Sequence, residues 1–124
     1  MSIDLKNKKI LVTGGNGFLG QHLSRKLIEQ GVRKEDIFTP HSKEYNLKNY
    51  DDCKKAAEGK NIVIHLAAKV GGIEYNRERP GELFYDNIIM GAKMMEASYR
   101  AGAEKFVMMG SVCAYPKFAP IPFK

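Results

Sequence analysis

The stretch that most constrains the fold is VTGGNGFLG, near the start of the chain. Its residues Gly15, Gly17 and Gly20 satisfy the pattern G-x-G-x-x-G. Before it, the apolar run KILVT at residues 9–13 predicts a short buried strand. After it, leucines recur every fourth position in residues 17–30 and predict an amphipathic helix that ends before a glycine. A strand, a tight glycine turn and a helix in this order indicate the opening of a β-α-β unit with parallel strands.

The rest of the chain continues the alternation of strands and helices. Apolar runs predict further strands at residues 36–39, 61–67 and 105–110, and helices are expected at residues 49–58 and 80–101. The glycine-rich segment KVGGIEYNRER, between the third strand and the last helix, is interpreted as a loop. This pattern predicts an α/β fold of the Rossmann type. We expect a doubly wound parallel sheet in three α/β/α layers, with right-handed crossovers and with each strand beside its neighbours in sequence.

Length and composition narrow the class of protein further. The chain has 124 residues, 44% hydrophobic and 27% charged, which is typical of one globular domain. It has no apolar run of about 20 residues and no signal peptide, so we expect a cytoplasmic protein without a membrane partner. Cys53 and Cys113 lie far apart without clustered histidines, which predicts neither a disulfide framework nor a metal site. The net charge of +6 comes from scattered basic residues and suits a phosphorylated nucleotide, although it would also suit weak nucleic-acid binding; we expect no nucleic-acid partner.

The glycine stretch predicts a site for the pyrophosphate of a dinucleotide. Gly14 and Gly15 permit a sharp turn, Gly17 lets the backbone approach the pyrophosphate, and Gly20 lets the helix pack closely on the sheet. A glycine-rich turn without a ligand is the alternative, which the strand before the turn and the helix after it disfavour. The pattern G-K-[ST] of an ATPase phosphate loop is missing after these glycines.

The residues after the second predicted strand favour NADP over NAD. An NAD site places Asp or Glu there, about 20 residues beyond the glycine loop, to bind the ribose 2′-hydroxyl. In this chain His41, Ser42 and Lys43 come first and Glu44 follows. A 2′-phosphate is bound by cations and hydroxyl donors, so Ser42 and Lys43 are candidate ligands for it. NAD stays open as the alternative, in which Lys43 is a solvated loop residue.

Three segments together resemble a known family. TGGNGFLG, HLAA at residues 65–68 and GS at residues 110–111 resemble the extended short-chain dehydrogenases that act on nucleotide sugars. The resemblance implies that HLAA lies on the nicotinamide side of the cofactor and that GS ends the strand that bears the catalytic hydroxyl. With these segments included, the predicted cofactor contacts are Gly14, Gly15, Asn16, Gly17, Phe18, Leu19, Gly20, Ser42, Lys43, Asn46, Leu47, Leu66, Ala67, Ala68 and Gly110.

Within that family, AAKVGGIEYNRERPGELFYDN followed by GSVCAYPK is similar to the GDP-L-fucose synthase branch. Those enzymes are NADP-dependent 3,5-epimerase/4-reductases of GDP-4-keto-6-deoxymannose. The resemblance covers residues 8–118, with departures at Asn16, where the branch often has a basic residue, and at Val112, where it usually has a serine. It implies a GDP-sugar substrate. Another nucleotide-sugar epimerase or dehydratase, or a non-catalytic dinucleotide-binding module, stays open as an alternative.

The resemblance also implies a catalytic pair, Ser111 and Cys113. Inversion of carbons beside a ketone needs a group that removes and returns protons, and a cysteine with a lowered pKa does this. A serine hydroxyl that hydrogen-bonds the ketone oxygen stabilises the developing negative charge. Without the resemblance, Cys113 would be interpreted as a small buried residue.

Other residues that the family needs are missing from the expected places. Its Y-x-x-x-K pair has one formal match, Tyr50 and Lys54, which falls in the second predicted helix and is interpreted as a coincidence. We therefore expect residues 1–124 to be the dinucleotide-binding part of a longer enzyme, inactive alone, with the sugar-binding domain beyond it. In the family the long helix pairs across a homodimer, and Met94, Met95 and Tyr99 are expected to supply exposed apolar surface for that pairing.

Overall fold

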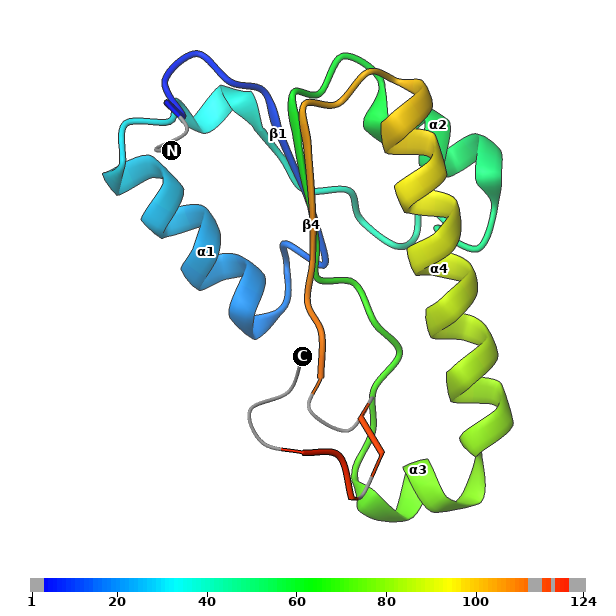
Figure 1. The fold of residues 1–124 in the computed structure, drawn as a ribbon. Helices are drawn as coiled ribbons and strands as arrows, with labels where there is room; N and C mark the ends of the chain where they lie inside the picture. Colours follow the sequence, from blue (N-terminus) through cyan, green and yellow to red (C-terminus); the bar gives the residue numbers. More distant parts are fainter. Residues whose placement is uncertain (1–3, 112–114, 117, 121–124) are drawn as a thin grey trace.

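The computed structural model describes residues 4–111, 115–116 and 118–120, and it shows a parallel sheet between two layers of helices (Figure 1). Along the chain the elements are β1 (Ile10–Thr13), α1 (Phe18–Glu29), a 3₁₀ turn (Lys34–Asp36), β2 (Ile37–Phe38), α2 (Tyr50–Ala57), β3 (Ile62–His65), α3 (Ile73–Glu78), α4 (Pro80–Arg100) and β4 (Lys105–Met108). The predicted Rossmann-type α/β architecture is confirmed.

The four strands lie in the order β2-β1-β3-β4, and every pair is parallel. Ile10 of β1 stands opposite both Ile37 and Ile62, and Thr13 stands opposite His65. The expectation that each strand lies beside its neighbours in sequence is wrong for β2 and β3, because the chain crosses back over β1 between them. This reversal puts a topological switch point between β1 and β3, where ligands of open α/β sheets bind.

Both faces of the sheet are covered, which explains the continuous apolar strands. On one face α1 packs through Leu27 against Ile10 and Val12. On the other face α2 and α4 pack through Cys53 and Met94, among others. Because successive strand residues point to opposite faces, a strand buried on both sides alternates between two cores and needs no polar residue. The sheet seen on edge, with α1 on one side and α2 and α4 on the other, is clear in Figure 1.

Two expectations about the long segment after β3 are wrong. The stretch predicted as a loop contains the helix α3, whose residues are all at least partly exposed. A helix of one and a half turns without a buried face has no apolar periodicity for a sequence pattern to detect. Met94, expected to be exposed on α4, is fully buried against the sheet, whereas Met95 and Tyr99 are exposed as expected.

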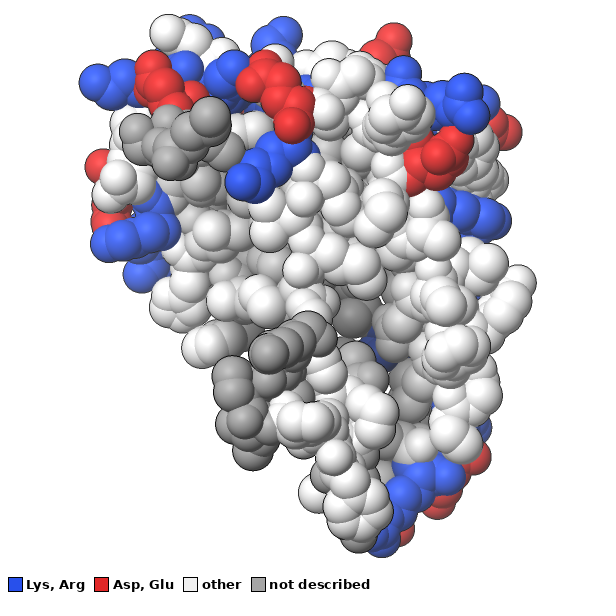
Figure 2. Space-filling view, viewed as in Figure 1, with Lys and Arg blue, Asp and Glu red and all other residues white. Residues whose placement is uncertain are grey.

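Charged side chains gather where the strands begin and around α3, whereas the face between them is largely uncharged (Figure 2). At the end where the strands begin, Lys8 pairs with Glu104 at 2.6 Å, and Asn61 also donates to Glu104. Residues Val107 and Met108 of β4 are half exposed. In the part of the chain that the structure describes, no helix is both long and apolar enough to span a membrane.

Candidate functional site

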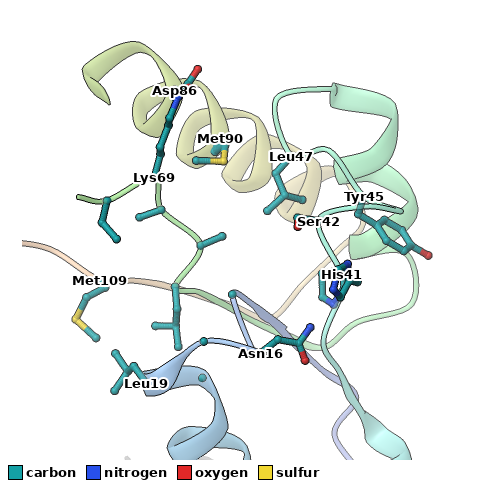
Figure 3. A pocket seen from close by; sticks show the side chains of 18 of the residues that line it. Asn16, Leu19, His41, Ser42, Tyr45, Leu47, Lys69, Asp86, Met90 and Met109 are labelled. Atoms are coloured by element: carbon teal, nitrogen blue, oxygen red, sulfur yellow. Dashed lines mark hydrogen bonds and ion pairs between the residues drawn. The ribbon is translucent and has the colours of Figure 1, made fainter. Parts of the chain in front are cut away.

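A pocket of about 680 Å³ opens at the carboxyl edge of the sheet. Five segments line it: the glycine loop between β1 and α1, the stretch from Pro40 to Lys48, the exit of β3 from Leu66 to Val70, α4, and Met109 just after β4 (Figure 3). The pocket therefore lies at the switch point between β1 and β3, where the fold alone predicts a ligand.

Most of the predicted cofactor contacts lie on the wall of this pocket. Those that line it are Gly14, Asn16, Gly17, Phe18, Leu19, Gly20, Ser42, Asn46, Leu47, Leu66, Ala67 and Ala68. Gly15, Lys43 and Gly110 do not line it. Gly15 lies against the side chain of Thr39, and the backbone N–H of Lys43 donates to Nδ1 of His41. Their contact with a cofactor stays a prediction, as it does for the residues on the wall.

The glycine loop makes two close backbone approaches. Gly14 has φ +68°, a left-handed conformation that side chains disfavour, and a Cβ there would lie 2.9 Å from the backbone N of Ala67. A Cβ on Gly20 would lie 2.4 Å from the carbonyl oxygen of Gly14. The first glycine thus brings the loop against the exit of β3, and the other brings α1 against the loop.

The start of α1 is suited to an anion. Gly17 precedes the helix in an extended conformation, and residues Gly17 to Gly20 line the pocket. The first N–H groups of a helix have no partner within it and form the positive end of its dipole. The first turn of α1 contains no acidic residue that would oppose a bound phosphate. This arrangement can bind a pyrophosphate through backbone donors.

Thr13 connects the ends of β1 and β3 beneath the pocket. Its hydroxyl accepts from the backbone N–H of Ala67 at 3.2 Å and lies 2.8 Å from Nδ1 of His65. Because a hydroxyl donates one hydrogen bond and accepts two, this contact is compatible with either neutral tautomer of His65. Burial lowers the pKa of His65, consistent with a neutral ring. His65 thus acts in the structure as a strand-end residue, as its sequence position indicates.

Side chains of α2 form hydrogen bonds with the backbone of the preceding stretch, at residues 46–47. The backbone N–H of Asn46 donates to Asp52 at 3.0 Å, and the thiol of Cys53 donates to the carbonyl oxygen of Leu47 at 3.2 Å. Burial raises the pKa of the Cys53 thiol to about 11, so it stays protonated at neutral pH. Cys53 is therefore a packing residue that helps to place Leu47 on the pocket wall, and the sequence pattern predicted no chemistry for it.

A charged cluster on the α4 side of the pocket was not among the predicted site residues. Asp86, 5% exposed, accepts from Lys48 and from Lys69, and Lys69 also pairs with Glu82. Hydrogen bonds from Lys69 and then Lys48 hold the pKa of Asp86 below its usual range. The side-chain amide of Asn87 exchanges two hydrogen bonds with the backbone of Lys69, at 2.7 and 2.9 Å.

A sequence signal for this cluster existed. Asp86 follows Leu83 by three positions on α4, so helical periodicity places a carboxylate on the face that packs against the sheet. A buried carboxylate needs a cationic partner. The partner lysines lie on two loops that are distant in the sequence. Sequence spacing therefore does not reveal which lysines they are. His41, Tyr45, Met90 and Met109 also line the pocket and were not predicted.

The predicted catalytic pair is only partly placed. Ser111 lies three residues past the end of β4, on the side where the strands end, and is exposed. Cys113 and its neighbour Val112 lie outside the described residues, so the catalytic role of the pair stays a prediction. Tyr50 and Lys54 contact one another on α2, with Nζ 5.5 Å from the ring centre, and neither residue lines the pocket.

The sequence profile of the NAD dependent epimerase/dehydratase family matches residues 10–124. The chain belongs to this family. Membership agrees with the strand, glycine loop and helix that build the pocket, and it identifies the chain as part of an enzyme family that uses a nicotinamide dinucleotide. Among the described residues, no group of three or more His, Cys, Asp or Glu is arranged to hold a metal ion.

Individual relatives narrow the similarity to enzymes of GDP-linked sugars. The chain is 34% identical over 122 residues to a GDP-L-fucose synthase of Sinorhizobium fredii, covering 97% of this chain and 38% of that protein. It is 30% identical over 125 residues to a GDP-mannose 3,5-epimerase of Arabidopsis thaliana, covering 91% of this chain and 33% of that protein.

A solved structure gives the same similarity in three dimensions. A GDP-L-fucose synthetase from Naegleria fowleri bound to NADP superposes with a TM-score of 0.75 at 28% identity, covering 96% of this chain and 36% of that one. The chain thus spans little more than a third of the length of the relatives it matches.

Proposed function

We propose that residues 1–124 are the dinucleotide-binding part of a cytoplasmic nucleotide-sugar epimerase or reductase, with a GDP-linked sugar as substrate and a reaction like that of GDP-L-fucose synthase. The observation that carries the proposal is the backbone approach of Gly14 to Ala67 across the switch point, beside the start of α1. A pocket whose wall has backbone donors and leaves no room for a Cβ suits a pyrophosphate. The relatives named for GDP-sugar reactions support the substrate class.

We propose NADP as the cofactor. The stretch after β2, from Thr39 to Lys43, contains no carboxylate to bind a ribose 2′-hydroxyl, and His41 and Ser42 line the pocket there. The backbone N–H of Lys43 donates to Nδ1 of His41, which leaves Nε2 of that ring to donate a proton. A hydroxyl, an imidazole N–H and the nearby Lys43 ammonium form a donor set that fits a phosphate.

In this proposal the chain's own residues perform three tasks. The glycine loop and α1 bind and orient the dinucleotide, which supplies hydride when bound. Ser111 donates a hydrogen bond to the ketone oxygen of the sugar and stabilises the charge that develops there. Cys113 takes the proton from a carbon beside that ketone, and the centre is inverted when the resulting enolate takes up a proton on its opposite face. Met109, two residues before Ser111, lines the pocket, which supports the role proposed for Ser111.

We also propose that the enzyme is a homodimer. The outer face of α4 exposes a row of large apolar side chains: Phe84, Tyr85, Ile88, Met95 and Tyr99. Exposed apolar rows of this size mark interaction surfaces. Sedimentation equilibrium of the protein should give a dimer, and Tyr99→Glu together with Ile88→Glu should shift it to monomer. A monomer in the unchanged protein would contradict this part of the proposal.

Binding of the two cofactors tests the proposed function directly. Isothermal titration should show NADP binding at least about tenfold more tightly than NAD. Ser42→Ala combined with Lys43→Ala should remove that preference by weakening NADP binding and leave NAD binding unchanged. The control is Lys34→Ala, another exposed lysine that lies outside the pocket. Tighter binding of NAD than NADP would contradict the assignment of the cofactor, and binding of neither would contradict the proposed function.

A further inference from the structure

The helix α4 contacts two walls of the pocket. One wall is the stretch at residues 46–48 before α2, and the other is the exit of β3 at residues 66–69. They belong to segments that are separated in the sequence by a helix and a strand. Asp86 lies where α4 passes between them, as Figure 3 shows for its position near Lys69 and Met90. With 5% of its surface exposed, it is one of the few buried charged side chains among the described residues.

The two carboxylate oxygens of Asp86 bind different walls. Oδ1 accepts from Nζ of Lys48 at 3.2 Å, and Oδ2 accepts from Nζ of Lys69 at 3.1 Å. One side chain on α4 therefore bridges two connections of the chain. An ion pair whose acid is buried is screened less by solvent than a surface pair, and its loss leaves the partner charges uncompensated.

Two other side chains of α4 form hydrogen bonds with the backbone of the same two walls. Nζ of Lys93 donates to the carbonyl oxygen of Lys48 at 2.6 Å. Asn87 forms its two hydrogen bonds with the backbone of Lys69. Asp86 is thus the member of this group whose side chain binds both walls.

We propose that Asp86 is a positioning residue that sets the separation of these two walls and thereby the fit of the pocket to a dinucleotide. The identity of that ligand rests on the proposed function; the positioning itself does not. Without the carboxylate, Lys48 and Lys69 lose the anion between them, and although Lys69 keeps its pair with Glu82, the two ammonium groups repel and the walls move apart. The lowered pKa of Asp86 keeps its carboxylate ionised, and hence the bridge intact, throughout the neutral range.

Asp86→Asn tests the proposal, because it keeps the shape of the side chain and removes its charge. Without any ligand, amide hydrogen exchange at residues 46–48 and 66–69 should become at least about tenfold faster, while exchange in β1 stays unchanged. Asp86→Glu should restore slow exchange in part. The matched control is Glu96→Gln, which removes an ion pair with Arg100 at 2.7 Å on the same helix but outside the pocket. It should leave exchange in both walls unchanged.

A second readout separates positioning from general stabilisation. Well below the melting temperature, Asp86→Asn should weaken NADP binding by about tenfold and Glu96→Gln by less than about twofold. A purely structural role would lower the melting temperature of Asp86→Asn and leave the affinity at low temperature unchanged. That result, or slow exchange in both walls of Asp86→Asn, would overturn the proposal.

Two further variants cover the case in which Asp86→Asn does not fold. Lys48→Met should speed exchange at residues 46–48 alone, and Lys69→Met at residues 66–69 alone. If each variant sped exchange in both walls equally, or in neither, the bridge would be excluded. If the unchanged protein bound neither NADP nor NAD, the proposed function would fail, and the exchange measurements would still decide the role of Asp86.

Discussion

On the side of β1 and α1, the wall of the pocket is backbone, and glycines bring it close to its neighbours. On the side of α4, the wall is held by charged side chains that reach across from a helix. The backbone wall has little freedom, because Gly14 and Gly20 leave no space for a Cβ. The side-chain wall depends on ion pairs that one change of charge removes. The comparison indicates that the first wall fixes where a pyrophosphate lies, and the second adjusts the space beside it.

The largest effect is expected from Gly14→Ala in the backbone wall. The change combines a left-handed φ of +68° with a contact of 2.9 Å to the backbone of Ala67. Strain and overpacking together should cost about 3 kcal/mol of unfolding free energy and abolish dinucleotide binding. Urea denaturation measures the first effect and titration the second.

Gly59→Ala is the matched control for that change. Gly59 has φ +65°, and a Cβ there would meet nothing within 4 Å. It should cost only the conformational strain, about 1 kcal/mol, and leave binding intact. Equal losses in the two variants would show that the approach of Gly14 to Ala67 adds nothing, which contradicts the account of this wall.

A smaller loss of unfolding free energy is expected when the hydroxyl of Thr13, which supports the backbone wall, is removed. Thr13→Val keeps the shape and removes the hydroxyl, which leaves the Ala67 N–H and Nδ1 of His65 without this partner in a buried place. The unfolding free energy should fall by about 2 kcal/mol. Ser98→Ala, which removes one buried hydroxyl that donates to Met94 at 2.6 Å, should cost less than about 1 kcal/mol. A Thr13→Val loss no greater than that of Ser98→Ala would contradict the bridging role of Thr13.

The smallest loss of stability is expected from a fall in pH, which acts on His65 at the end of β3. Burial lowers the pKa of folded His65 below its unfolded value of about 6.5, so the folded protein resists the proton that the unfolded chain takes up. Stability should therefore be full above pH 6.5 and decrease as the pH falls below it. Urea denaturation between pH 7.5 and pH 5 checks this, with His65→Gln as the comparison. If both proteins lost the same stability over this range, another group would be responsible.

The comparison of the backbone wall with the side-chain wall also explains what the sequence could predict. VTGGNGFLG predicts the backbone wall, because a glycine pattern between a strand and a helix reflects local steric needs. The segment HLAA was found only through a resemblance, although the pairing of Thr13 with His65 places it beside the glycine loop. The bridge from Asp86 to Lys48 and Lys69 was missed, because it joins residues that only tertiary packing brings together. The short helix α3 was missed because it has no buried face.

The central claim is that NADP binds at the carboxyl edge between β1 and β3, and a nuclear magnetic resonance titration tests it most directly. With ¹⁵N-labelled protein, NADP should shift the backbone amides of residues 13–20, 41–47 and 66–69. Amides around Lys54 and Arg100, in the separate surface hollow between α2 and α4, should stay in place. Saturable shifts confined to the first set would support the account. Saturable shifts confined to the second set, or no shifts at NADP concentrations that saturate the relatives, would contradict it.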